Sequence, residues 1–184
     1  MNNDIEQGMS DAEAVANAGA IQSLPVIFHA QFVRDISFEN PQPALLYETK
    51  GPRPTMDVNF SIECAPVKSE QFKFMYEVQL GIKVRARRDN DIAFLTEVLY
   101  SVLVSMDGVP EEQHHPLLYI EAPRYAFPFV RMIIANLTQN AGMLPLLLTP
   151  VDFRALYMQR FGEDIRKSQQ AAQSATQGAT QGAA

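Results

Sequence analysis

The chain has 184 residues, of which 47% are hydrophobic and 20% are charged, and its formal net charge is -6. These values indicate one globular domain with a hydrophobic core rather than a disordered chain. The acidic balance argues against a protein that binds nucleic acid, because phosphate contacts require an excess of Lys and Arg. The single cysteine, Cys64, excludes an intrachain disulfide framework.

The start of the chain and its apolar runs bear on the cellular compartment. The N-terminus has neither a basic start nor the apolar core of a signal peptide. No apolar run reaches the length that spans a membrane without a charge or a proline. We therefore expect a protein of the reducing cytoplasm that does not insert into a membrane.

The two ends of the chain differ in composition from the middle. Residues 1–23 contain Asp and Glu but no Lys or Arg, and residues 164–184 end in a low-complexity stretch of Ala, Gln, Thr and Gly. Neither segment can bury enough apolar surface to offset the entropy lost on ordering. Both are predicted to be mobile tails, and the ordered domain is predicted to span 24–163.

Alternation of apolar and polar residues dominates the first half of this domain. Apolar side chains occupy every second position in 55–64 and in 77–87, as is typical of strands with one buried face. Residues 88–91 predict a tight turn, because Asp and Asn tolerate the backbone angles of turns.

The strand predicted over 92–105 is apolar on both faces. One face carries Ile92, Phe94, Thr96, Val98, Tyr100, Val102 and Val104, and the other carries Ala93, Leu95, Leu99 and Leu103 beside Glu97, Ser101 and Ser105. A strand of this kind must be covered on both sides. A second layer, a second subunit or a bound client would each provide that cover.

The second half of the domain changes to helical spacing. An apolar stripe over 126–141 predicts a helix with Pro128 near its start and Gly142 at its end. A last helix is predicted to begin with Thr149 as its cap and Pro150 at its first position. Its stripe consists of Phe153, Leu156, Tyr157 and Phe161. Strands followed by helices indicate an α+β fold, with helices packed on one face of an antiparallel sheet.

The sequence shows no pattern that requires catalysis. A Gly-rich phosphate-binding loop is absent. The adjacent His114 and His115 cannot share one helical face, and we interpret them as a solvated pair near a turn rather than as metal ligands. Cys64 ends an apolar alternation, which favours a small buried side chain over a nucleophile. We expect no enzyme activity, no cofactor and no metal.

Four segments, in this order, resemble the SecB family of protein-export chaperones. They are the strand motif VRDISFENP at 33–41, the hairpin formed by 76–78 and 94–98, the helix entry around FPFVR at 127–131, and LPLLLTPVDF at 144–153. Together they cover about 24–161. The resemblance implies a SecB-like protomer with a four-stranded antiparallel sheet, which assembles as a homotetramer built from two dimers. It also implies an ATP-independent holdase that binds unfolded preproteins and delivers them to the SecA motor.

The resemblance assigns roles to particular residues. The family's SecA-contacting positions correspond to Asp35, Glu39, Leu95 and Glu97. From the residues alone these carboxylates are solvated strand positions, although Asp35 and Glu39 share a face of an extended strand, as do Leu95 and Glu97.

A client-binding groove is predicted to involve four apolar residues, Phe60, Ile62, Leu99 and Leu103. A second set of positions, Lys83, Arg85, Arg87 and Arg88, is more basic than the family strand and is interpreted as a solvated sheet face, with a client or motor contact as the alternative.

Two other functions stay open. A SecB-like chaperone could serve one dedicated client such as an antitoxin, although the presence of Asp35, Glu39 and Glu97 weighs against this. A small oligomeric α+β enzyme is the other alternative, which a pocket with converging polar groups would support.

Overall fold

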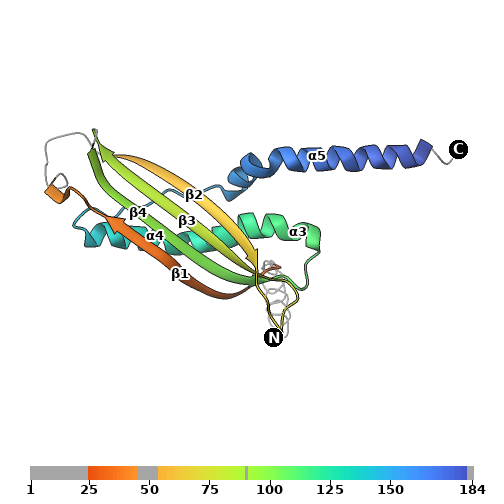
Figure 1. Ribbon diagram of the computed structural model, residues 1–184, viewed down its shortest axis with the longest axis horizontal. Coiled ribbons are helices and arrows are strands. Elements are labelled where there is room, and N and C mark those ends of the chain that lie inside the picture. Colours follow the sequence, from red (N-terminus) through yellow and green to blue (C-terminus); the bar gives the residue numbers. More distant parts are fainter. Residues whose placement is uncertain (1–24, 45–53, 90, 182–184) are drawn as a thin grey trace, which may run out of the picture.

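A four-stranded antiparallel sheet forms the centre of the molecule (Figure 1). The computed structural model describes residues 25–44, 54–89 and 91–181, so the tail predicted over 1–23 lies outside the described residues. The strands are β1 (Ile27–Glu39), β2 (Thr55–Pro66), β3 (Met75–Arg88) and β4 (Asp91–Ser105). Their order in the sheet is β1-β4-β3-β2, which makes β1 and β2 the edge strands. The α+β fold with helices on one face of the sheet is confirmed.

The hairpin between β3 and β4 confirms the turn predicted over 88–91. Asp89 has a φ of 53°, in the left-handed region that Asp tolerates better than most residues. Next to the turn, Ala86 pairs with Phe94 and Arg87 pairs with Ile92. Residue 93 is therefore an extra residue in β4, and Ile92 leaves the apolar stripe in which the alternation had placed it.

The helices α3 (Glu111–Pro116), η1 (Leu117–Glu121) and α4 (Ala122–Asn140) follow one another without a break, and α4 packs against β3 and β4. The prediction that this helix starts near Pro128 was wrong, because helical backbone begins at Glu111. The single π-helical turn η1 lies between Pro116 and Pro123, neither of which can donate a backbone hydrogen bond. Gly142 ends α4 as predicted, with a φ of 80°.

One set of alternating strand residues forms the core under α4. Its fully buried members include Val78, Leu80, Ile82, Val84, Val98, Val102 and Val104 from the sheet, with Ala126, Val130 and Ile134 from α4. We call this side of the sheet the helix face. In Figure 1 no described helix lies over the other side, which we call the open face.

The last helix, α5 (Phe153–Gln181), differs from the prediction at both ends. Asp152, not Thr149, is its cap, since the Asp152 Oδ1 accepts a hydrogen bond from the Ala155 N–H at 3.0 Å. Phe153 is 1% exposed and fixes the start of the helix against the core. The helix runs on through the region predicted as a tail, because that region is rich in Ala and Gln, which favour helix. Figure 1 shows its C-terminal part projecting away from the sheet.

Candidate binding surfaces

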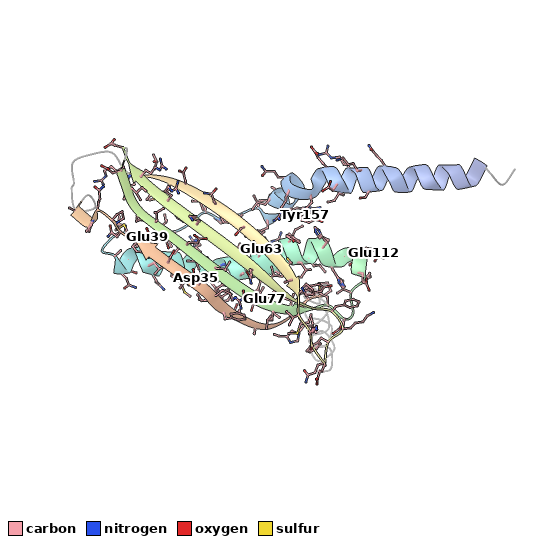
Figure 2. All side chains as sticks on the ribbon, viewed as in Figure 1. Asp35, Glu39, Glu63, Glu77, Glu112 and Tyr157 are labelled. Atoms are coloured by element: carbon pink, nitrogen blue, oxygen red, sulfur yellow. The ribbon has the colours of Figure 1, made fainter. Side chains whose placement is uncertain are left out.

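The open face brings together the four residues predicted to contact SecA. Across β1 and β4, Asp35 pairs with Leu99, Ser37 with Glu97, and Glu39 with Leu95. The three carboxylates are exposed, and Leu95 is half-buried between them. Figure 2 shows Asp35 and Glu39 along β1. We call these four residues the acidic cluster: Asp35, Glu39, Leu95 and Glu97.

A row of basic residues lies beside the acidic cluster. The Lys83 Nζ is 2.9 Å from the Glu97 Oε2, and both side chains are about half exposed. Arg85 and Arg87 follow on the same face of β3. An exposed ion pair of this kind contributes little to stability, so a basic group of a partner could take the place of Lys83.

A polar network crosses the open face at the opposite end of the sheet. The Glu77 Oε1 accepts hydrogen bonds from the Ser101 hydroxyl at 2.6 Å and from the Gln79 Nε2 at 3.1 Å, and the Arg34 Nε is 3.7 Å away. These contacts, the Ser101 hydrogen bond most of all, hold the pKa of Glu77 below its ordinary value against the opposing effect of burial. The contacts of Glu77 with Ser101 and Arg34 have no local signal in the sequence, because these residues meet only through strand register.

An apolar groove lies between the edge strand β2 and α5. Phe60 and Ile62 of β2, Tyr119 of η1 and Leu156, Tyr157 and Phe161 of α5 line it, together with Gln159 and Arg160, and its volume is about 380 Å³. We call this cavity the groove. Its aromatic and aliphatic lining suits apolar segments of varied sequence, since apolar contact is not directional.

Four aromatic rings from α3, η1 and α5 pack together beside the groove in tilted and edge-on contacts, and one of them is the imidazole of His115. The His115 Nδ1 is 2.9 Å from the Tyr157 hydroxyl, and the His115 ring packs against those of Tyr119 and Phe161. Burial, followed by the positive charge of Arg160, lowers the pKa of His115, which favours the neutral imidazole.

The interpretation of the two histidines as a solvated pair was wrong. His114 is 5% exposed, its Nε2–H donates to the Val109 carbonyl at 2.9 Å, and its Nδ1 is 3.3 Å from the Tyr76 hydroxyl. Neighbouring residues on a helix point in directions about 100° apart, so His114 enters the core while His115 faces α5.

Cys64 lies next to this part of the molecule. The side chain is half-buried, and burial raises the pKa of the thiol to about 11 despite the opposing effects of Tyr119 and Arg160. The thiol is therefore neutral, in agreement with the predicted small buried side chain. Within the described ranges, no group of three His, Cys, Asp or Glu side chains could hold a metal ion.

The four residues predicted to form one client groove do not lie together in a chain. Phe60 and Ile62 point to the helix face and line the groove. Leu99 and Leu103 pair with Gly81 and Glu77, whose side of the sheet is the open face. The prediction that all four residues line one groove within one chain was therefore wrong, because the strand register places the two pairs on opposite sides of the sheet. A client contact by each pair stays a prediction.

An exposed apolar surface that the sequence analysis missed lies on β1 and α4. Val33 and Ile36 of β1 are 43% and 41% exposed, and Met132 of α4 is 56% exposed. Phe28 stacks on Tyr125 at 4.0 Å between ring centroids, which joins the two elements. We call this surface the β1–α4 patch.

Among the helices that the structure describes, none is long and apolar enough to cross a membrane.

Comparisons with known proteins agree with the fold and with the resemblance. The family model described as preprotein translocase subunit SecB matches residues 20–164. The protein-export protein SecB of Zymomonas mobilis is 41% identical over 131 residues, which are 71% of this chain and 77% of the relative. That of Rhodospirillum rubrum is 35% identical over 161 residues, 88% of this chain and 96% of the relative.

A solved structure shares the fold. It is a SecB-like chaperone of Mycobacterium tuberculosis in complex with an antitoxin peptide, with a TM-score of 0.53 and 14% identity over 68% of this chain and 90% of that one. The family match and the identity to curated relatives over most of their length go beyond a shared fold. The chain therefore belongs to the SecB family of protein-export chaperones.

Proposed function

We propose that this protein is an ATP-independent holdase that binds unfolded preproteins in the cytoplasm and delivers them to the SecA motor. The observation that carries the proposal is the separation of two surfaces by one sheet. The groove lies on the helix side of β2, and the acidic cluster lies on the open face of β1 and β4. A client and a motor protein could therefore bind at the same time.

The chemistry of each surface suits its proposed partner. Clients of a holdase differ in sequence, so the affinity must come from apolar contact and backbone pairing, which tolerate that variety. Several groove contacts along one unfolded chain multiply through effective concentration. The exposed carboxylates of the acidic cluster suit a basic surface on SecA, and such pairing directs association more than it adds affinity. Without ATP hydrolysis, the arrival of SecA would change the balance of contacts and release the client.

The alternative of a chaperone dedicated to an antitoxin has weaker support. The solved relative that binds an antitoxin peptide is 14% identical to this chain, which supports a common fold alone. The relatives called protein-export proteins are 41% and 35% identical. Export is therefore the function that we propose.

We further propose a homotetramer built as a dimer of dimers. The β1–α4 patch combines exposed apolar residues with an edge strand, and both features are typical of interfaces between subunits. Light scattering at micromolar concentration should give the mass of four chains. A double variant with Ile36→Asp and Met132→Glu should give smaller particles that remain folded. A monomeric wild-type protein would contradict this assembly.

Suppression of aggregation tests the holdase proposal. An unfolded preprotein is diluted into buffer with this protein and no nucleotide, and light scattering follows its aggregation. We expect protection near stoichiometric ratios, and several-fold weaker protection by Phe60→Ser, which removes an aromatic wall of the groove. Asn59→Ser is the matched control, because Asn59 is next to Phe60 in the sequence but its side chain lies on the open face. Protection that required ATP would refute the proposal.

A further inference from the structure

The outer edge of β2 exposes backbone groups beside the groove. The Val67 N–H donates to the Met75 carbonyl at 2.8 Å, so odd-numbered residues at this end turn their backbone groups toward β3. Backbone direction alternates along an antiparallel strand. Residues 58, 60, 62 and 64 therefore turn their N–H and C=O groups away from the sheet, and their side chains point to the helix face.

Arg160 of α5 occupies one position on this edge. Its Nη1 donates to the outward carbonyl of Ile62 at 3.0 Å. Its guanidinium also lies over the rings of Phe161 and Tyr119, at 5.0 Å and 5.7 Å from their centroids. The Nη1–H of Arg160 therefore donates to the Ile62 carbonyl in the place of the backbone N–H that a neighbouring strand would provide.

We propose that the edge of β2 accepts an extended client segment as an additional antiparallel strand, and that Arg160 is a placeholder which the client displaces. This inference rests on the proposed holdase function and specifies how a client segment binds. Residues of an added strand that bond to β2 point their side chains to the same face as their β2 partners. That face is the helix face, so those side chains enter the groove beside Phe60 and Ile62.

The geometry selects one kind of occupant. It fits an extended segment with an apolar side chain at every second residue and a free backbone N–H at each of those residues. Folded proteins have nearly all of these N–H groups already paired, so the edge discriminates against them. Backbone pairing is also independent of sequence, as a holdase for many preproteins requires.

Arg160 also protects the edge when no client is bound. An exposed edge strand pairs readily with other chains, and a charged side chain placed on it opposes such pairing. A client must replace the Arg160 hydrogen bond and the contacts of its guanidinium with two aromatic rings. Because displacement of Arg160 has this cost, isolated contacts of a client do not displace it, whereas several consecutive backbone hydrogen bonds do.

Methylated peptides test the strand addition directly. A short fluorescent peptide in which Val or Phe alternates with Gln or Ser is titrated with the full-length protein, and anisotropy reports binding. Methylation of the backbone nitrogen at the apolar residues removes the donors to β2 and should weaken binding by about tenfold or more. Methylation at the intervening polar residues should change it less than about twofold. Equal effects of the two methylation patterns would overturn the inference.

Substitution of Arg160 tests the placeholder role. Arg160→Ala and Arg160→Met should both bind the unmethylated peptide about three- to tenfold more tightly, since one competing hydrogen bond is lost. Arg154→Met, an exposed arginine earlier on α5, is the matched control and should leave the affinity unchanged. Unchanged or weaker affinity of both Arg160 variants, with wild-type melting temperatures, would show that Arg160 is not a placeholder.

The two levels of the proposal fail differently. If the peptide binds and aggregation is suppressed, but neither the methylation pattern nor Arg160 matters, the strand addition is wrong and the holdase function stands. If neither the peptide nor an unfolded preprotein binds to the wild-type protein, the holdase function itself is wrong and the inference falls with it.

Discussion

The two faces of the sheet are built from the same strands but differ in what covers them. On the helix face, Ile82 and Val98 are completely buried under α4. Their neighbours along the chain, Lys83 and Glu97, form a half-exposed ion pair on the open face. The difference follows from the alternation of side chains along a strand, which gives successive residues different roles. One set of residues holds the fold together, and the intervening set is available for recognition.

The open face is itself divided. At one end, the three carboxylates of the acidic cluster are exposed, as are Lys83 and Arg87 of β3. At the other end, Ser101 is 0% exposed, and its hydroxyl is bonded to Glu77. Polar groups on this face therefore contribute to stability where they are buried together, and are accessible to a partner where they are exposed.

The largest difference between the faces should appear when apolar side chains are truncated. Ile82→Ala removes a fully buried side chain and should lower the free energy of unfolding by about 3 kcal/mol. Leu99→Ala removes a half-buried side chain from the open face and should cost about 1 kcal/mol. Chemical denaturation at one fixed protein concentration measures both. Equal losses would mean that the open face is covered in solution and would contradict its role as a free surface.

A smaller effect is expected at the buried end of the open face. Glu77→Gln removes the charge that accepts the Ser101 hydrogen bond and should cost about 1–2 kcal/mol at neutral pH. Since the pKa of Glu77 is lowered in the folded state, its stabilisation is present above the ordinary value of 4.5 and is lost as the pH falls through the folded value.

The pH dependence separates this stabilising effect from a general effect of charge. Wild type should lose stability more steeply than Glu77→Gln as the pH falls below about 4.5, near the unfolded pKa of glutamate. Glu63→Gln, an exposed carboxylate on β2, is the control and should change stability by less than about 0.5 kcal/mol. Parallel pH profiles of wild type and Glu77→Gln would show that the network does not stabilise the fold.

Local pattern was sufficient to predict much of the fold. Alternation predicted β2, β3 and β4, and Gly142 marked the end of α4, because each depends on residues close in sequence. The common face of Asp35 and Glu39 is also confirmed, since the irregularities of β1 lie before Asp35.

Features that depend on strand register or on tertiary packing could not be predicted from the sequence. The prediction of Thr149 as the cap of α5 was wrong, because the burial of Phe153 sets the start of the helix directly after Asp152. The separation of Phe60 from Leu99 follows from strand pairing, and the burial of His114 follows from where α3 lies on the core. Neither has a local signal in the sequence.

Calorimetric titration against SecA tests most directly whether the open face is a recognition surface. Wild type, Glu97→Lys and the control Glu63→Lys would be compared at low and at moderate salt. Figure 2 shows Glu63 on β2, at the opposite edge of the sheet from Asp35 and Glu39. Exposed charge reversals should change the free energy of unfolding by only about 0.5 kcal/mol, so melting and sizing controls should match wild type.

We predict that Glu97→Lys lowers the affinity for SecA by about tenfold or more, because repulsion replaces attraction at the interface. The loss should shrink as added salt screens the charges, and Glu63→Lys should bind SecA like wild type. Unchanged affinity of a well-folded Glu97→Lys variant would contradict the proposed contact between SecA and the acidic cluster.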